Sequence, residues 1–468
     1  MDRFSQLPEP LLPIIISHLP FKEAARNSIL SETWLRLWRS TQNVEFNERF
    51  FVNTDAAAVD RAIQRRTFID FVLHWMENNQ ENQVGKIAVT ISEPENSEEF
   101  VQHCIRFSLE HYVKHLALDF SDPRWDDAGY GTQAYFDFPL YVYTQRELES
   151  LALFSCNFNA SLFVNFGLLK HISLGWIKLP VLVQETLLAQ CRFLESLSLK
   201  KCRGMDYLDI RGKNFKLKLK TLVVDRCRIR YPHFFYLEAP KLRYLKFVGG
   251  AVPELTADEG SEFNFFEELD LDLSLVKEFH SSASPNSILA TLHPARALTV
   301  CSYTLRVIIN HTKEKPIIPS PRLTVGHLTL KTTMHDHEQF GIKFFFNCCP
   351  NLETLTIERC PEEILEYYAT PSVLKPQEMW KGNVEVYECI TRTLRMVEVK
   401  GYMGSQHELD LLSYLLTHGP CMEQLTVITS SDEEVNGGNP EEFRLKAQEF
   451  LHQVEAASQN PNLEITVL

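Results

Sequence analysis

One short pattern recurs along the chain and constrains its fold more than any other feature. It reads apolar, two residues, apolar, one residue, apolar, as in LESLAL from Leu148 and LESLSL from Leu194. Further copies read VGKIAV, VKHLAL, LKHISL, LKTLVV, LRYLKF, FEELDL, ARALTV, VGHLTL, LETLTI, LRMVEV and MEQLTV, and start at residues 84, 113, 169, 219, 242, 266, 295, 325, 352, 394 and 422. Most starts lie 21 to 30 residues apart, with wider steps from 113 to 148 and from 352 to 394. Self-similarity at such a period predicts a repeat protein.

The end of each copy alternates apolar, variable and apolar residues, which is typical of a short strand with one buried face. The roughly 15 to 20 residues between copies have room for a helix or an irregular return. This is the layout of leucine-rich repeats, whose units bury their apolar faces only by stacking on one another. We therefore predict an α/β fold in which parallel strands with helical or loop returns form an irregular, curved solenoid.

The cysteines follow the same period. Four of the eleven lie three residues after the last strand apolar of their units, and two lie three residues before the first apolar: Cys156, Cys202, Cys227 and Cys360, then Cys191 and Cys349. Free cysteine packs as a small apolar residue, so we interpret these six as buried positions of a ladder rather than as a metal site. An odd number of cysteines without a secretory signal also favours reduced thiols over a disulfide framework.

The charge and the hydropathy exclude some classes of partner. The chain has 47 Lys and Arg against 61 Asp and Glu, a formal net charge of −14. Because this charge repels nucleic acid and anionic membranes, we expect neither as a partner. Asp2 precedes a first apolar run that contains prolines, which is a poor signal peptide, and no stretch of eighteen apolar residues occurs. We expect a cytosolic or nuclear protein.

Two segments stand apart from the repeats. Residues 54–79 carry apolar residues at near-helical spacing after Asp55, a plausible N-cap, and predict a helix that joins an N-terminal domain to the solenoid. The apolar positions are Ala58, Ala62, Ile69, Val72 and Trp75. Residues 431–442, SDEEVNGGNPEE, are acidic and rich in Gly, Asn and Pro, so we expect a solvent-exposed loop there.

The N-terminal segment LPEPLLPIIISHLPFKEAARNSILSETWLRLW, residues 7–38, has a distinctive order. Two Leu-Pro pairs bracket an apolar helix, and Arg26, the pair Leu30-Ser31 and then WLRLW follow. This order closely resembles the F-box, a three-helix module that docks on the Skp adaptor of SCF-type ubiquitin ligases, over Phe4 to about Phe46. There are two departures from the family pattern. Pro13 removes a hydrogen-bond donor from the first helix, and Glu32-Thr33 replaces a basic pair.

Elementary physics supports a partner for this segment. Helices of about ten residues are marginal alone in water, and the apolar residues exceed what a forty-residue module can bury, so a contiguous apolar surface is left for an interface. Our candidates for contact with the adaptor or for packing within the module are Leu7, Pro8, Leu11, Ile15, Leu19, Pro20, Leu30, Trp34 and Leu37. The alternative is that all of them form the core of an N-terminal cap of the solenoid.

The C-terminal part carries a second resemblance. Residues 380–428 resemble the FBD region that ends many plant F-box proteins with leucine-rich repeats. The shared elements are Trp380, the strand LRMVEVKGY, the helix HELDLLSYLL and the closing strand MEQLTVI. The phrase LEAPKLRYLKF, from Leu237 to Phe247, is also typical of that family's repeats. The resemblance implies a plant source.

No catalytic constellation stands out in the sequence. Phosphate-loop, nucleophile-elbow, HExxH, CxxC and GxGxxG patterns are all absent. The triplet His335-Asp336-His337 could approach a metal, but we favour a solvated loop. Asp270 and Asp272 are expected on the variable face of their strand, where they could accept hydrogen bonds from a ligand, although exposed charges are common there. We therefore expect no catalytic residue, no metal and no cofactor.

These observations lead to one hypothesis with two rivals. The expected domains are an F-box (1–46), a linker helix (47–80), leucine-rich repeats (81–379) and an FBD-type region (380–468). The resemblance implies a non-catalytic substrate-recognition subunit of an SCF ubiquitin ligase. Its partners would be a Skp-type adaptor, through it a cullin, and a target protein of unknown identity. One alternative is a non-ligase interaction protein, and the other is a small-molecule receptor that uses the concave face of the solenoid.

Overall fold

The computed structural model describes most of the chain, and every structural statement below concerns the residues it describes. These are 16, 19, 21–39, 41–80, 84–92, 94–125, 136–211, 217–231, 234–249, 254–256, 266–273, 292, 295–310, 322–360, 379–381, 385–430, 440–455, 460 and 463–468. The chain divides into two compact units. The N-terminal unit holds residues 1–230 with 238–240, and the C-terminal unit holds 231–237 and 241–468.

Parallel strands form the sheet of the N-terminal unit. In spatial order they are β1 (Asn43–Asn47), β2 (Lys86–Thr90), β3 (His115–Asp119), β5 (Ser150–Phe154), β7 (His171–Gly175), β8 (Ser196–Lys200) and β10 (Thr221–Asp225). Neighbouring strands pair at equivalent repeat positions, so that Leu116 faces Leu151 and Leu151 faces Ile172. Short strands β4 (Phe136–Asp137) and β6 (Cys156–Asn157) pair beside this sheet, and β9 spans Leu208–Arg211.

The returns between these strands include α-helices and 3-10 turns. They comprise α4 (Ala58–Glu77), α5 (Glu98–Glu110) and α6 (Val181–Gln190), with 3-10 turns η2 (Glu48–Phe50), η3 (Pro94–Asn96), η4 (Leu140–Thr144) and η5 (Ala160–Asn165). The tightest repeat, from residue 148 to 169, is closed by η5 rather than by an α-helix. Before the sheet come two short helices, α2 (Phe21–Asn27) and α3 (Glu32–Arg39).

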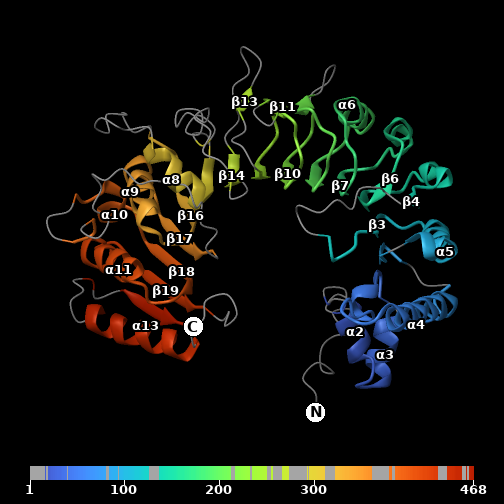
Figure 1. Cartoon of the computed structure of the whole chain (residues 1–468), viewed down its shortest axis with the longest axis horizontal. Helices are drawn as coiled ribbons and strands as arrows, with labels where there is room; N and C mark the ends of the chain where they lie inside the picture. The colour runs from blue at the N-terminus through green and yellow to red at the C-terminus, as the bar shows by residue number, and fades with distance from the viewer. Residues whose placement is uncertain are drawn as a thin grey trace. The chain divides into compact units, whose positions relative to one another are not determined.

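The C-terminal unit has the same plan of parallel strands with helical returns. Its sheet has the order β12 (Tyr244–Val248), β14 (Phe266–Asp272), β15 (Ala295–Cys301), β16 (His327–Thr332), β17 (Thr354–Arg359), β18 (Met396–Tyr402), β19 (Gln424–Thr429) and β20 (Glu464–Val467). The returns comprise α8 (Ser302–Asn310), η6 (Asp336–Glu338), α9 (Gln339–Cys348), α10 (Glu388–Arg392), α11 (Gln406–His418) and α13 (Pro440–Glu455). In Figure 1, α9, α10, α11 and α13 lie on one side of strands β16 to β19. Strands β11 (Phe234–Glu238) and β13 (Glu254–Thr256) pair separately.

The predicted repeat pattern is confirmed by burial. In all thirteen copies the three apolar positions are buried, none with more than 4 % of its surface exposed. Two strands of this series, β1 and β20, were missed, one at each end, as were the short strands β4, β6, β9, β11 and β13 outside it. In the β1 repeat the first apolar position is occupied by Thr41, which is nevertheless buried. A hydroxyl residue in that position hides the pattern from a search for apolar residues.

The segment expected as a linker helix forms α4, with differences from our prediction. Its N-cap is Ala57 rather than Asp55, and Ala57 makes no side-chain capping bond. Ala58 and Ala62 are exposed, because the buried face consists of Phe68, Val72, Trp75 and Met76. Since α4 connects the neighbouring parallel strands β1 and β2, it is also the return of the first repeat.

The loop predicted at residues 431–442 can be checked only in part. Residues 431–439 lie outside the described residues. Pro440, Glu441 and Glu442 form the first turn of α13 and not a loop. A proline in the first turn loses no helical hydrogen bond, and carboxylates there interact favourably with the helix dipole.

All eleven cysteines are free thiols. Four of the six predicted ladder positions are buried, whereas Cys227 and Cys360 are only half-buried. Equivalent thiols make equivalent contacts, since Cys202 Sγ lies 3.4 Å from the Leu174 carbonyl oxygen and Cys227 Sγ 3.4 Å from that of Leu199. Burial raises the pKa of Cys191 to about 12 and that of Cys360 to about 11, so these thiols stay protonated at neutral pH.

Candidate adaptor-binding surface

Helix α3 of the N-terminal segment begins with a capping residue. Ser31 stands at the N-cap, and its Oγ accepts a hydrogen bond from the Trp34 backbone N–H at 3.3 Å. Glu32 lies in the first turn, and Arg36 and Arg39 lie in the last turn. Both placements are favourable for the helix dipole. The acidic residue that departs from the family pattern therefore stabilises this helix.

Helix α3 keeps its apolar side chains partly exposed. No residue of α3 is buried, and Trp34, Leu35, Leu37 and Trp38 are all half-buried. Helix α2 packs against α3 and against β1, and Ala24 is buried there. The segment is thus attached to the first strand of the sheet while a large apolar face of α3 remains incompletely covered.

The turn between α2 and α3 presents two adjacent aliphatic side chains to solvent. Ile29 is 85 % exposed and Leu30 is 68 % exposed. Burying one such side chain completely is worth roughly 1.5 to 3 kcal/mol. Two exposed aliphatic side chains directly before the half-buried apolar residues of α3 are a feature of the kind that marks a protein interface. We call Ile29, Leu30, Trp34 and Leu37 the adaptor face.

The structure describes four of the nine predicted site residues. Leu30 is exposed, Trp34 and Leu37 are half-buried, and all three lie on the adaptor face, while Leu19 is half-buried. The other five, Leu7, Pro8, Leu11, Ile15 and Pro20, lie outside the described residues. Ile29, the most exposed of these side chains, was not among the residues predicted from the sequence. Its only signal was its position next to Leu30 in the polar stretch NSILSE.

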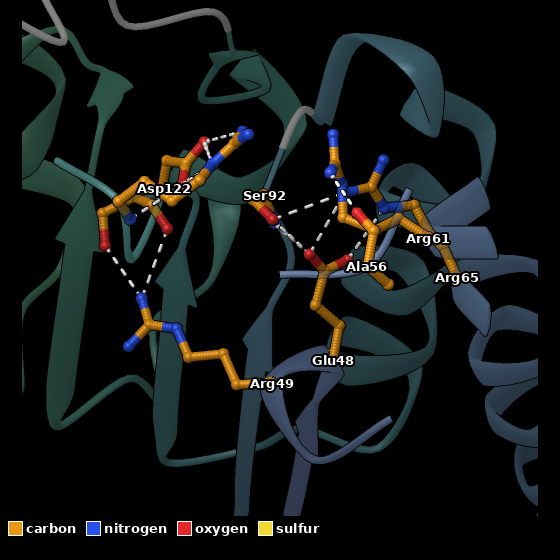
Figure 2. A network of polar contacts seen from close by, with 9 residues as sticks. Glu48, Arg49, Ala56, Arg61, Arg65, Ser92 and Asp122 are labelled. Carbon is orange, nitrogen blue, oxygen red and sulfur yellow. Dashed lines mark hydrogen bonds and ion pairs between the residues drawn. The ribbon is translucent and has the colours of Figure 1, made fainter. Parts of the chain in front are cut away.

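A buried carboxylate lies directly after β1. Glu48 accepts hydrogen bonds from Arg65 Nε at 3.0 Å, from the Ser92 backbone N–H at 3.0 Å and from the Ser92 hydroxyl (Figure 2). Arg49 reaches β3 from the same turn, and its Nη2 lies 3.4 Å from Asp119 Oδ2. These contacts join α4 to the ends of three strands, so the sheet edge that receives α2 is held in place.

We predict that Glu48→Gln lowers the free energy of unfolding of the N-terminal unit by about 2 kcal/mol, because it weakens charge-assisted hydrogen bonds to a largely buried guanidinium. Urea unfolding, monitored through the hydrogen exchange of the backbone amides in β1 and β2, measures the change. Glu23→Gln is the control, since it removes an exposed ion pair with Arg26 that is worth at most about 1 kcal/mol. Equal effects of the two substitutions would contradict this role of Glu48.

Two other candidate sites differ from our expectations. The triplet at 335–337 is a half-buried turn and not a solvated loop, because Asp336 pairs with His407 of α11 and the rings of His335 and His337 are in contact. Among the described residues, no group of three or more His, Cys, Asp or Glu could hold a metal ion.

Asp270 also differs from our prediction of an exposed acceptor. It is 6 % exposed, and its carboxylate lies 2.6 Å from Lys246 Nζ and 3.7 Å from Lys331 Nζ. The strand-face position was correct, since Asp270 pairs with Lys246 across β12 and β14. The two flanking lysine side chains cover it and supply its charge partners.

Comparison with known proteins agrees with this architecture. An F-box domain model matches residues 4–45, and a family model described as "At1g61320/AtMIF1, LRR domain" matches residues 76–457, most of the chain. The chain belongs to the F-box/LRR-repeat family. A relative from Arabidopsis thaliana named among the F-box/LRR-repeat proteins, At5g54820, is 32 % identical over 435 residues, with 89 % of this chain and 88 % of the relative covered.

Other relatives of this F-box/LRR-repeat protein also come from Arabidopsis thaliana, in line with the plant source that the resemblance implied. The F-box protein At3g62230 is 30 % identical over 430 residues, which cover 91 % of this chain and 90 % of the relative. The F-box/FBD/LRR-repeat protein At1g78750 is 23 % identical over 444 residues, which cover 91 % and 90 %. Within the described part of the chain, no helix has both the length and the apolar character needed to span a membrane.

Proposed function

We propose that this F-box/LRR-repeat protein is the substrate-recognition subunit of an SCF-type ubiquitin ligase. Its F-box binds a Skp-type adaptor and through it a cullin, and its solenoid binds a target protein. The observation that carries the proposal is the adaptor face, where Ile29 and Leu30 are exposed beside the half-buried Trp34 and Leu37. An F-box domain is matched at these same residues.

In this role the chain acts by holding two partners close together. A target bound on the solenoid places its lysines near a ubiquitin-loaded enzyme and so raises their effective concentration. No side chain of this protein has to make or break a bond, so we propose a non-catalytic adaptor without a cofactor. The cytoplasm and the nucleus, where such ligases meet their targets, are the proposed locations.

We also propose that residues 380–468 form an FBD-type region that continues the solenoid. Strand β18 pairs with both β17 and β19, as expected for such a continuation. Trp380, the opening residue of the resemblance, donates from its Nε1 to Gln339 Oε1 at 2.8 Å, and its ring centroid lies 5.0 Å from that of Tyr414. The tryptophan therefore fastens the start of this region to α9 and α11. A relative with FBD in its name supports the assignment.

The decisive experiment is binding of the full chain to a plant Skp adaptor by calorimetry, comparing the native protein with Ile29→Ala/Leu30→Ala. We expect the double substitution to cost about 2 to 4 kcal/mol, roughly 30- to 1000-fold in affinity. Both residues are exposed in the free chain, so their loss leaves the fold intact.

A matched control is available on α4. Val59 and Ile63 are exposed to 71 % and 61 %, and Val59→Ala/Ile63→Ala removes a similar amount of aliphatic surface outside the F-box. This control should bind the adaptor like the native chain. Absence of binding by the native chain, or equal losses in both variants, would refute the proposed adaptor face. A stable adaptor complex that recruits no cullin would instead indicate a non-ligase interaction protein.

A further inference from the structure

The charge of this chain is distributed very unevenly. Residues 170–230 contain fourteen Lys and Arg but five Asp and Glu, a net charge of +9 within a chain of net charge −14. These residues span the three adjacent strands β7, β8 and β10 of the N-terminal unit. Because neighbouring repeats stack side by side, the excess of cations in the sequence becomes a local excess on the molecule.

The residues that follow these strands share one backbone conformation. Trp176, Lys201 and Arg226 each come directly after the last strand residue, with φ of 55°, 53° and 51°, and Ser155 after β5 has φ of 55°. The backbones stay paired in this row, since Trp176 N donates to Lys200 O at 3.0 Å and Lys201 N to Asp225 O at 2.7 Å. Because these residues share one backbone conformation and occupy equivalent positions of adjacent repeats, their side chains lie in a row.

Aromatic rings lie at one end of the row. Lys201 Nζ is 4.7 Å from the Trp176 ring centroid, and the Trp125 ring centroid is 5.2 Å from that of Trp176. Phe154 lies over Gly175, where an added Cβ would be 2.2 Å from the Phe154 Cδ1. All three rings are half-buried and therefore still present part of their surface to solvent.

A second row of cations runs beside the first. Lys178 pairs with Arg203 in an isolated parallel bridge, and the Arg228 backbone N–H donates to the Cys202 carbonyl at 2.8 Å. The Lys178 stem lies against Gly204, whose bare backbone gives it room. Among the described residues, Asp225 lies 3.7 Å from Arg226 and Asp206 lies 3.8 Å from Arg230. Over residues 170–230 the cations outnumber the anions by fourteen to five.

We propose that this basic–aromatic surface, formed by Phe154, Trp176, Lys178, Lys201, Arg226 and Arg228, binds an acidic segment of the target protein. The segment carries carboxylate or phosphate groups for the cations and an aromatic or aliphatic side chain for Trp176 and Phe154. This inference rests on the proposed function, in which the solenoid holds a target. Charge complementarity supplies the attraction and the orientation, and the rings supply an anchor.

The size of the surface fits a peptide better than a nucleic acid. The surface crosses the four adjacent strands β5, β7, β8 and β10. At a spacing of about 4.8 Å these strands give a row of roughly 14 Å, which matches about four residues of extended peptide. Residues 170–230 have a net charge of +9, so the rest of the chain has a net charge of −23. The rest of the chain therefore repels a long polyanion that extends beyond the surface.

The test is direct binding to the full chain, measured by fluorescence anisotropy. The probe is a short fluorescein-labelled peptide of glutamates around a central leucine and phenylalanine, and the comparison probes are its glutamine counterpart and single-stranded DNA of similar length. We expect the acidic peptide to bind in a salt-sensitive manner. Lys201→Glu/Arg226→Glu should weaken binding at least tenfold, and Trp176→Ala should weaken it severalfold.

The same repeats provide matched controls at the opposite ends of their strands. Lys218→Glu/Lys220→Glu makes the same charge change, and Phe193→Ala removes an exposed ring that also lies under a lysine, with Lys218 Nζ 4.2 Å from its centroid. These variants should change the affinity less than twofold. Equal losses in the control variants, equal binding of the glutamine peptide, tighter binding of DNA, or no binding at all would overturn the proposal. Since no adaptor is present in this assay, its failure is distinct from failure of the F-box to bind Skp.

Discussion

Replacing Glu338 by alanine is expected to lower the free energy of unfolding of the C-terminal unit by about 3 to 5 kcal/mol. Its carboxylate is fully buried and accepts from Arg306 Nη2 at 2.7 Å and from the Thr333 backbone N–H at 3.0 Å, as well as from the Ser302 hydroxyl. Arg306 is also buried, so the substitution leaves an uncompensated charge among α8, β16 and η6. Urea denaturation followed by circular dichroism measures the loss.

Glu353→Ala is the control, because Glu353 is an exposed carboxylate of the same unit. It should change the free energy of unfolding by no more than about 0.5 kcal/mol. A loss below about 1 kcal/mol in Glu338→Ala would contradict the assignment of Glu338 as a support of this unit.

The lowered pKa of Glu338 predicts that the stability of the C-terminal unit depends on pH. Burial acts to raise the pKa of Glu338, but hydrogen bonds from Ser302 and Thr332 and the charge of Arg306 outweigh it and hold the pKa below its ordinary value. A carboxyl with a lower pKa in the folded than in the unfolded chain binds fewer protons when folded. The contribution of Glu338 to the free energy of unfolding is therefore complete above the ordinary glutamate pKa. It is lost as the pH falls through the pKa that Glu338 has in the folded chain. Glu338→Gln should show a smaller loss of stability on acidification than the native chain.

Gly341→Ala should destabilise the C-terminal unit by roughly 3 kcal/mol, at the upper end of the cost of overpacking. An added Cβ would lie 2.2 Å from the Leu305 carbonyl oxygen and 2.7 Å from the Leu305 Cα, which are backbone atoms of α8. A flexible side chain could move aside, but here the two helices α8 and α9 must separate. Thermal unfolding with hydrogen exchange of the two helices measures the effect.

Gly326→Ala is the matched control for this prediction. At Gly326 the nearest atom to an added Cβ is the Asn351 carbonyl oxygen at 3.9 Å, an ordinary contact. This substitution adds the same methyl group to the same unit and should change stability by less than about 1 kcal/mol. If Gly341→Ala is as well tolerated as Gly326→Ala, the close approach of α8 and α9 is not required for stability.

The polar residues were harder to place from the sequence than the apolar ones. Asp270 was correctly assigned to the variable face of its strand, yet it is buried, because Lys246 and Lys331 from other strands cover it. Whether a side chain on that face is exposed depends on the length and charge of its neighbours across the sheet. Those neighbours are about 24 and 61 residues away in the sequence, beyond the reach of any local pattern.

The site was predictable only in part for a related reason. Leu30, Trp34 and Leu37 could be named as candidate anchors from their order in the segment, and their contact with an adaptor stays a prediction. Ile29 could not be named, because its exposure depends on how α2 and α3 pack. Likewise the row of Trp176, Lys201 and Arg226 is visible only once adjacent repeats are in register. The sequence shows the three residues at intervals of 25, without showing that their side chains face the same way.

Thirteen strands of the solenoid and the three buried apolar positions of each repeat pattern were predictable from the sequence, because each repeat carries its own apolar pattern and must bury it against equivalent neighbours. Contacts formed in the folded chain were needed to identify the outermost strands β1 and β20, the use of α4 as a return, the exposure of Ile29 and Leu30, and the grouping of cations beside Trp176. Burial of an apolar strand face follows from a local period. The exposure and the partners of the remaining side chains follow from contacts between residues far apart in the sequence.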